Sequence, residues 1–136
     1  MATTTATITL SSSDLTGDAL SLSATATLTK ADSVTGLDQT SGVARKIYTQ
    51  DSADVLIDET SVTVDKAHKL YVRNPSTVAS EYFLISVGDA GADTDIGRLY
   101  AGDWMFIPYG AADNIDIVVT PSVATTMVLE YMLIHE

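Results

Sequence analysis

Three aspartates on one glycine-rich stretch have the types and spacing that best suit metal chemistry. Asp89, Asp93 and Asp95 lie within Gly88-Asp-Ala-Gly-Ala-Asp-Thr-Asp. Carboxylate oxygens on a loop are ligands that Ca²⁺ accepts, but the EF-hand spacing fails because Gly91 occupies the third ligand position. The stretch is therefore a candidate calcium site, and the alternative is an ordinary acidic turn between two strands.

The imidazoles available for acid–base chemistry are His68 and His135. A catalytic triad needs a rigidly held histidine beside a serine on a sharp turn. The chain has no Gly-x-Ser-x-Gly motif, no glycine-rich phosphate loop and no dinucleotide-binding motif. A second acidic cluster, within residues 51–59, is typical of a solvated strand end. We therefore predict no catalytic residue, no cofactor-binding residue and no enzyme activity.

Charge and cysteine content exclude several further classes of function. The 136 residues include 7 Lys+Arg, 18 Asp+Glu and no Cys, which gives a net charge of −11. Without a clustered positive stripe, binding to nucleic acid or to an anionic membrane is disfavoured. Without cysteine there is neither a disulfide framework nor a Cys-based zinc site. The first residues lack the basic and apolar segments of a secretory signal, so we expect synthesis in the cytosol and no membrane span.

The polarity of the chain is carried by hydroxyl groups rather than by charges. Ser and Thr together make up about a quarter of the residues, while Asp, Glu, Lys and Arg make up 18%. Threonine favours β-strands, and a surface poor in Lys and Glu is typical of faces that contact another protein. The sequence therefore suggests a β-protein with surfaces that a partner covers.

Alternating residues near the N-terminus indicate two strands. In residues 20–29, leucine and alanine alternate with serine and threonine, and residues 4–11 repeat the pattern with Ala6, Ile8 and Leu10 on one side. Such a period of two predicts half-buried strands. They could form a hairpin across residues 11–18, or residues 1–15 could form an extended arm that pairs with a neighbouring subunit.

Strand-like segments continue to the end of the chain, separated by turn signals such as Asn74-Pro75. They cover residues 43–49, 55–57, 61–64, 68–73, 81–87, 96–100, 104–108, 115–120 and 126–135. About ten short strands without helical periodicity predict an all-β fold, an antiparallel, jelly-roll-like β-sandwich with little or no helix. We expect a single domain over residues 1–136.

Two of these segments, residues 104–107 and 127–134, are apolar on both faces. A strand of this kind is either central in its sheet or covered by a partner on its outer face. The adjacent cations Arg45 and Lys46 could dock an acidic partner surface, and Trp104 could instead serve as a platform for a carbohydrate. The predicted core or interface residues are Ile8, Leu10, Trp104, Phe106, Tyr131 and Met132.

Three motifs stand out in the second half of the chain. A Tyr-Val-Arg-Asn strand lies at residues 71–74, and Leu-Tyr-Ala-Gly-Asp is followed by an aromatic strand that ends in Phe-Ile-Pro at residues 99–108. A closing strand contains Leu-Glu-Tyr at residues 129–131. In these motifs the chain resembles small all-β virion proteins of tailed bacteriophages. The resemblance covers about half of the chain, from Lys66 onward.

This resemblance implies a non-enzymatic virion protein, assembled in the host cytoplasm. We expect a capsid cement or decoration protein that binds the major capsid protein and stabilises the particle. Such proteins are often trimers, so a homo-oligomer is expected. The alternatives are a neck, tail or fibre-associated virion component and, if Trp104 is a carbohydrate platform, a carbohydrate-binding module.

Overall fold

The computed structural model describes residues 3–136, whose regular secondary structure is almost entirely β-strand. The strands are β1 (Thr5–Thr16), β2 (Asp18–Thr27), β3 (Gln39–Thr40), β4 (Ala44–Tyr48), β5 (Asp54–Ile57), β6 (His68–Arg73), β7 (Tyr82–Val87), β8 (Thr94–Tyr100), β9 (Trp104–Tyr109), β10 (Ile117–Pro121) and β11 (Met127–His135). One 3-10 helix, η1 (Glu59–Ser61), lies between β5 and β6. The described residues contain no helix of the length and hydrophobicity that crossing a membrane requires.

The chain divides after Asp38 into two compact units. We call the part up to Asp38 the hairpin unit and Gln39–Glu136 the sandwich unit. The sequence predicted one domain over residues 1–136; within the chain, β1 and β2 form a two-stranded sheet of their own. Of the two arrangements considered for the first strand, the intrachain hairpin is the one observed, while residues 1 and 2 of the predicted arm lie outside the described residues.

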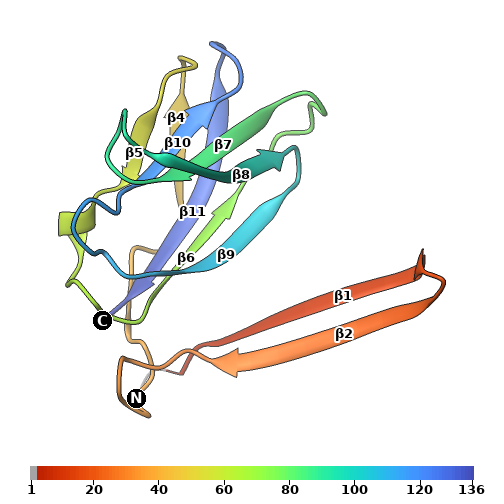
Figure 1. Cartoon of the computed structure of the whole chain (residues 1–136), viewed down its shortest axis with the longest axis vertical. Helices are drawn as coiled ribbons and strands as arrows, with labels where there is room; N and C mark the ends of the chain where they lie inside the picture. The colour runs from red at the N-terminus through yellow and green to blue at the C-terminus, as the bar shows by residue number, and fades with distance from the viewer. Residues whose placement is uncertain (1–2) are drawn as a thin grey trace. The chain divides into compact units, whose positions relative to one another are not determined.

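The hairpin is a long antiparallel ribbon (Figure 1). The strand pairing extends into residues 11–18, for which the sequence predicted a turn, and its last pair is Thr16 with Asp18. Gly17 makes the tight turn possible because its φ of 78° lies in the left-handed region, which glycine adopts without strain. The Ser12 hydroxyl accepts hydrogen bonds from the amides of Asp14 (3.3 Å) and Leu15 (3.1 Å). Both amides thus have a partner where the strand pairing is irregular.

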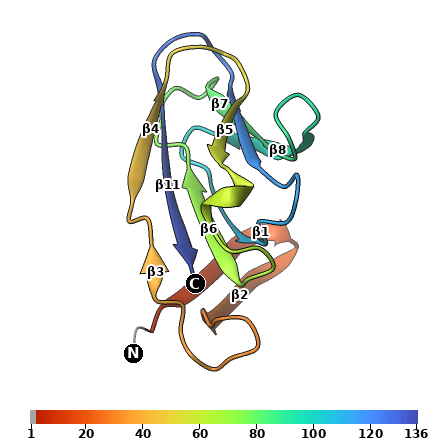
Figure 2. The same cartoon turned by 90° about the vertical axis from the view of Figure 1, so that its left-hand side faces the viewer.

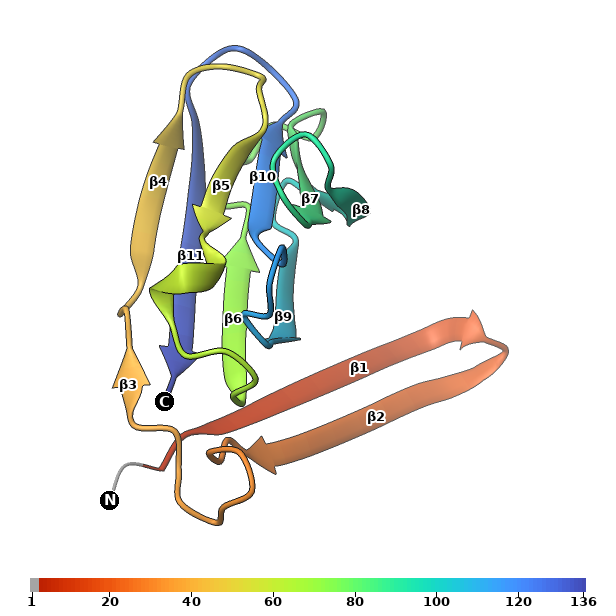
Figure 3. The same ribbon diagram turned by 60° about the vertical axis from the view of Figure 1, so that its left-hand side comes forward.

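The sandwich unit consists of two antiparallel sheets (Figure 2, Figure 3). One has the strand order β5-β10-β7-β8, and the other has the order β3-β11-β6-β9, with β4 also paired to β11. β3 and β4 pair with successive parts of β11 and act as one interrupted edge strand. The pairs β4–β11, β5–β10, β6–β9 and β7–β8 are therefore nested, as in a hairpin folded back on itself. This is jelly-roll topology, so the predicted fold class is confirmed.

The core lies between these two sheets. Its fully buried side chains include Leu70 of β6, Phe83 of β7 and Leu129 of β11, each 0% exposed. The rings of Tyr48 and Phe83 pack at a centroid distance of 5.6 Å with a tilt of 56°. β6 and β9 each contribute every second residue to this layer, as the period of two requires. The opposite residues of the same strands are left for the outer faces.

One predicted strand is wrong. The segment 61–64 was expected to be extended, but the chain coils into η1 at Glu59–Ser61 just before it. The Asp58 carboxylate caps this turn by accepting a hydrogen bond from the amide of Thr60 at 2.8 Å. Hydrogen bonds from the hydroxyl and amide of Thr60 lower the pKa of Asp58, so the cap stays ionised. A local side-chain cap has here overridden the β-propensity of the valines that follow.

Candidate functional site

The hairpin separates its residues into two chemically different faces. Direct cross-strand partners share a face, and the register pairs Ile8 with Ala24 and Leu10 with Leu22. We call this side the apolar hairpin face; it comprises Ala6, Ile8, Leu10, Leu20, Leu22, Ala24 and Ala26. The other side, the hydroxyl hairpin face, comprises Thr5, Thr7, Thr9, Ser11, Ser21, Ser23, Thr25 and Thr27.

The apolar hairpin face lies in solvent. Ile8 is 41% exposed, Leu10 49% and Leu22 46%. The sequence predicted that this side would be half-buried, and that prediction is wrong. Alternation determines which residues share a face, but a face is buried only where a second layer covers it. An exposed row of large apolar side chains on a ribbon makes this face a candidate surface for binding a partner.

The hairpin carries its charge at one end. Asp14 and Asp18, on either side of the turn at Gly17, are the only charged side chains between residues 3 and 29. Leu15 at the same tip is 75% exposed. The ribbon is thus apolar on one face, uncharged and hydroxyl-rich on the other, and acidic at its tip.

A second surface is the outer side of the sheet that contains β11. Leu70, Val72 and Leu129 point into the core, so the alternate residues of β6, β11, β4 and β9 point away from it. We call this side the outer sheet face. It comprises Arg45 and Ile47 of β4, Val128, Glu130, Met132 and Ile134 of β11, Lys69, Tyr71 and Arg73 of β6, and Trp104, Phe106 and Pro108 of β9. Ile134, near the end of β11, is only 6% exposed.

The register arranges these residues in rows across the strands. Met132, Tyr71 and Phe106 are direct neighbours and form a half-buried apolar row at the centre of the face. At one end of β9, Trp104 is 51% exposed. For Trp104, Ile8 and Leu10 the core interpretation is therefore wrong, while their interpretation as interface residues stays a prediction.

The outer sheet face is positively charged in an otherwise acidic protein. Glu130, the one carboxylate on this face, accepts hydrogen bonds from Nε and an Nη of Arg45 at 3.2 Å each, and it lies across the strand from Arg73. Lys69 Nζ donates to two backbone carbonyls, those of Ala67 (2.9 Å) and His68. Three cations against one carboxylate leave a net charge of +2 on the face.

The adjacent cations Arg45 and Lys46, predicted as a possible docking pair, point to opposite faces of β4. Arg45 points to the outer sheet face, whereas Lys46 pairs with Asp54 at 2.7 Å and donates to the carbonyl of Val55. Only Arg45 therefore contributes to a candidate surface. Asp54 belongs to the acidic cluster of residues 51–59, and its ion pair with Lys46 agrees with the structural interpretation of that cluster.

The three aspartates of the calcium candidate lie on and beside the β7–β8 loop without converging. Among the described residues, no three acidic or histidine side chains are grouped as a metal site would need. Asp95 accepts a hydrogen bond from Ser86 at 3.0 Å, and Asp93 accepts one from the amide of Gly91. Hydrogen bonding from its own backbone amide lowers the pKa of Asp93. A Cβ at Gly88 would lie 3.0 Å from the Cα of Asp93, so the loop needs glycine there for its shape.

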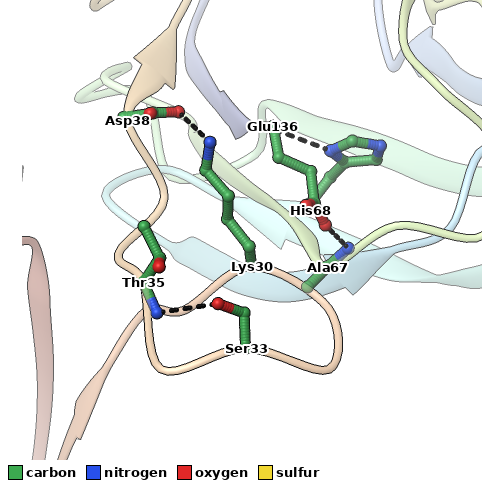
Figure 4. Close-up of polar contacts among 7 residues, drawn as sticks. All are labelled: Lys30, Ser33, Thr35, Asp38, Ala67, His68 and Glu136. Carbon is green, nitrogen blue, oxygen red and sulfur yellow. Dashed lines mark hydrogen bonds and ion pairs between the residues drawn. The ribbon is translucent and has the colours of Figure 1, made fainter.

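His68 and Glu136 hold the end of the chain in place (Figure 4). His68 is 0% exposed, and its Nε2 lies 2.7 Å from the carbonyl of Thr63, to which it donates. Its Nδ1 accepts from the amide of Glu136, whose carboxylate accepts from the amide of Ala67 at 3.0 Å. Both ring nitrogens are thus engaged by backbone groups. This gives His68 a structural role and no free nitrogen for chemistry.

A separate polar cluster stiffens the loop that follows β2 (Figure 4). Lys30 and Asp38 form an ion pair at 2.9 Å, and the Ser33 hydroxyl accepts from the amide of Thr35 at 2.9 Å. These contacts lie within the hairpin unit and close the base of its loop. None of them forms a reactive arrangement.

The predicted site residues fall into three places. Ile8 and Leu10 lie on the apolar hairpin face, Trp104, Phe106 and Met132 lie on the outer sheet face, and Tyr131 lies on the opposite side of β11, where it packs against the core. Leu22, Tyr71 and Arg73 also lie on these surfaces but were not among the residues predicted from the sequence. The signal was present in the alternation of their strands, but only the register shows which neighbours they join.

Comparison with known proteins adds little about function. No protein-family model matches the chain, and no curated protein matches it in sequence. Among solved structures, the chain is similar to the crystal structure of the Yersinia pseudotuberculosis-derived mitogen, with a TM-score of 0.46 and 6% identity, over 72% of this chain and 86% of the mitogen chain. A likeness this slight carries no inference about function.

Proposed function

We propose that this protein is a non-enzymatic structural component of a virus particle, a capsid cement or decoration protein. The observation that carries the proposal is the hairpin, whose large apolar side chains Ile8, Leu10 and Leu22 are 41–49% exposed. A surface of that kind suits a protein whose working state is an assembly. The resemblance of the second half to small phage virion proteins supports the same conclusion.

The hairpin has the physical properties of a docking element. A two-stranded ribbon is at best marginally stable in water, so a partner that covers it contributes to its stability by mass action. Its faces carry no charged side chains, and hydroxyl and apolar groups are less costly to remove from water than charges are. Either face of the hairpin can therefore be buried without burying an unpaired charge.

The sandwich unit would supply the rigid body of such a component. Its jelly-roll core fixes the positions of the outer sheet face and of the loops, while the net charge of −11 keeps the protein soluble. Binding would then be directed to complementary surfaces on the particle, with the major capsid protein as the expected partner.

The test is the stoichiometry of the protein in purified particles of the virus that encodes it. We expect on the order of hundreds of copies, as for a component that repeats with the symmetry of the shell. Quantitative mass spectrometry against the major capsid protein gives this number. About a dozen copies or fewer would favour a neck, tail or fibre component instead, and absence from the particle would overturn the proposal.

One observation favours a second candidate, a carbohydrate-binding module. Trp104 is 51% exposed at the start of β9, which is where a sugar platform would need an aromatic ring. Glycan-array binding by the wild type that is lost in Trp104→Ala would support this function. Matched binding by both proteins, or by neither, would exclude it.

A further inference from the structure

We propose that the apolar hairpin face of one copy docks on the outer sheet face of a second copy. This deepens the proposed function by naming the partner of the hairpin, and it rests on that function only for its biological setting.

The two surfaces match in shape and hydrophobicity. At about 3.4 Å per residue, the ten-residue β2 and the nine-residue β11 are both about 30 Å long. A ribbon laid over β11 and β6 would form a third layer, as sheets do when they pack face to face. Leu10 and Leu22 would then meet the row of Met132, Tyr71 and Phe106, so that each surface covers apolar side chains of the other.

The charges of the two surfaces are complementary. The hairpin carries two acidic side chains and no basic one between residues 3 and 29, whereas the outer sheet face has a net charge of +2. Most of an acidic protein repels a second copy of itself. The outer sheet face differs, because its Arg73 and Lys69 attract the acidic tip of the hairpin. This favours a second copy of the chain as the occupant.

The buried area favours an exchange in which every copy both gives and receives a hairpin. A ribbon about 34 Å long and about 10 Å wide covers roughly 340 Å² of a flat surface, less than the roughly 800 Å² per partner of a standard interface. Giving one hairpin and receiving another doubles the area that each copy buries. Such a head-to-tail contact closes into a ring, of which a trimer is one example, or into a reciprocal dimer.

Sedimentation of the purified full-length protein, without particles, tests the proposal. We expect a concentration-dependent closed oligomer that dissociates as salt rises, because its charged contacts are exposed. Leu22→Asp places a charge on the apolar hairpin face and should weaken self-association at least about tenfold. The matched control is Ser23→Asp, which adds the same charge one residue away on the hydroxyl hairpin face and should sediment as wild type.

A variant of the other surface completes the pair. Met132→Glu should also weaken self-association at least about tenfold, because it places a charge in the central apolar row. Arg73→Glu lies at an exposed position and serves as a second variant should Met132→Glu fail to fold, which circular dichroism would reveal.

Mixing distinguishes this contact from every symmetric alternative. Leu22→Asp retains an intact outer sheet face, and Met132→Glu retains an intact hairpin. An equimolar mixture of the two monomeric variants should therefore form a one-to-one heterodimer through one remaining contact. Contacts between two hairpins, or between two sheets, would not give this result.

Three outcomes would overturn the proposal. The first is a wild-type protein that stays monomeric at all concentrations, as it would if the hairpin folded back on its own subunit. The second is a folded Met132→Glu or Arg73→Glu variant that associates like wild type. The third is a mixture that forms no heterodimer. These outcomes are independent of the copy number in particles. A protein abundant in the shell but monomeric in solution would retain the proposed function and refute only this inference.

Discussion

The hairpin and the sandwich share the same alternation of apolar and polar residues but differ in whether the apolar side is buried. Both are antiparallel, and both alternate apolar with polar residues along their strands. In the sandwich, Leu70 is 0% exposed because a second sheet covers it, whereas Leu22 in the hairpin is 46% exposed. The comparison teaches that alternation reports how residues are sorted between faces, and that burial depends on a second layer.

The polar sides of the two regions also differ. The outer sheet face carries Arg45, Arg73, Lys69 and Glu130, while the corresponding side of the hairpin carries only hydroxyl groups. Charged side chains keep a surface wet because they are costly to desolvate, whereas serine and threonine can pair with each other, as Thr7 and Thr25 do at 2.8 Å. The low charge density of the first 30 residues therefore suits a ribbon that a partner covers.

The largest expected difference between the two regions is in the response to loss of a leucine side chain. Leu129→Ala should lower the free energy of unfolding by about 2–5 kcal/mol, because it leaves a cavity in the core. Leu22→Ala should change it by no more than about 0.5 kcal/mol at concentrations where the protein is monomeric. Chemical denaturation measures both values. Equal losses would show that the hairpin face is buried in solution.

A smaller difference is expected for polar groups. Asn74 is buried, and its side-chain amide donates to the carbonyls of Leu99 (3.0 Å) and Glu81, so Asn74→Ala should cost about 1–3 kcal/mol. Thr25→Ala, which removes an exposed hydroxyl pair, should cost no more than about 0.5 kcal/mol. Thermal and urea unfolding of the two variants, compared with wild type, would contradict this if the order were reversed.

The smallest expected effect is a dependence on alkaline pH that belongs to the sandwich alone. Burial, aided by Asp116, raises the pKa of Tyr109 from 10.0 to about 12, and its hydroxyl has no protein hydrogen-bond partner among the described residues. The stabilisation is fully present below pH 10 and is lost as pH rises toward 12, because the unfolded chain ionises first. At pH 11 the free energy of unfolding should be lower by about 1 kcal/mol than it is well below pH 10.

Tyr109→Phe should flatten this dependence between pH 10 and 12, as measured by urea unfolding at a series of pH values. The hairpin contains no tyrosine, so spectroscopic signals from residues 5–27 should not change over the same range. An unchanged slope in Tyr109→Phe would place the alkaline sensitivity elsewhere, with Tyr48, whose pKa burial also raises, as the next residue to replace.

Much of the fold could be predicted from the sequence, because strand patterns are local. The segments around β4, β6, β7, β9 and β11 were expected where they occur, since apolar runs bounded by Gly, Asn and Pro leave few alternatives. The errors have local causes as well. The Asp58 cap converted an expected extended segment into η1, and Gly17 allowed β1 and β2 to pair beyond the predicted loop.

The candidate surfaces were harder to predict than the strands. Ile8, Leu10, Trp104, Phe106 and Met132 could be singled out as large apolar residues, but whether each was core or surface depended on contacts far apart in the sequence. β11 is central in its sheet and β9 lies at an edge, yet both carry apolar side chains on the outer sheet face. Only the strand order shows which neighbours each of these strands has.

The sequence by itself determined the β class, the sorting of hydroxyl and apolar residues along the hairpin, and the acidic, cysteine-free composition. These are properties of single residues and of a period of two. The tertiary structure decided that Arg45, Arg73 and Lys69 share one face with Tyr71, Phe106 and Met132, and that the apolar side of the hairpin is left in solvent. The physical reason is that neighbours across a sheet, and the layers that cover it, are set by pairing between distant segments, which no local pattern encodes.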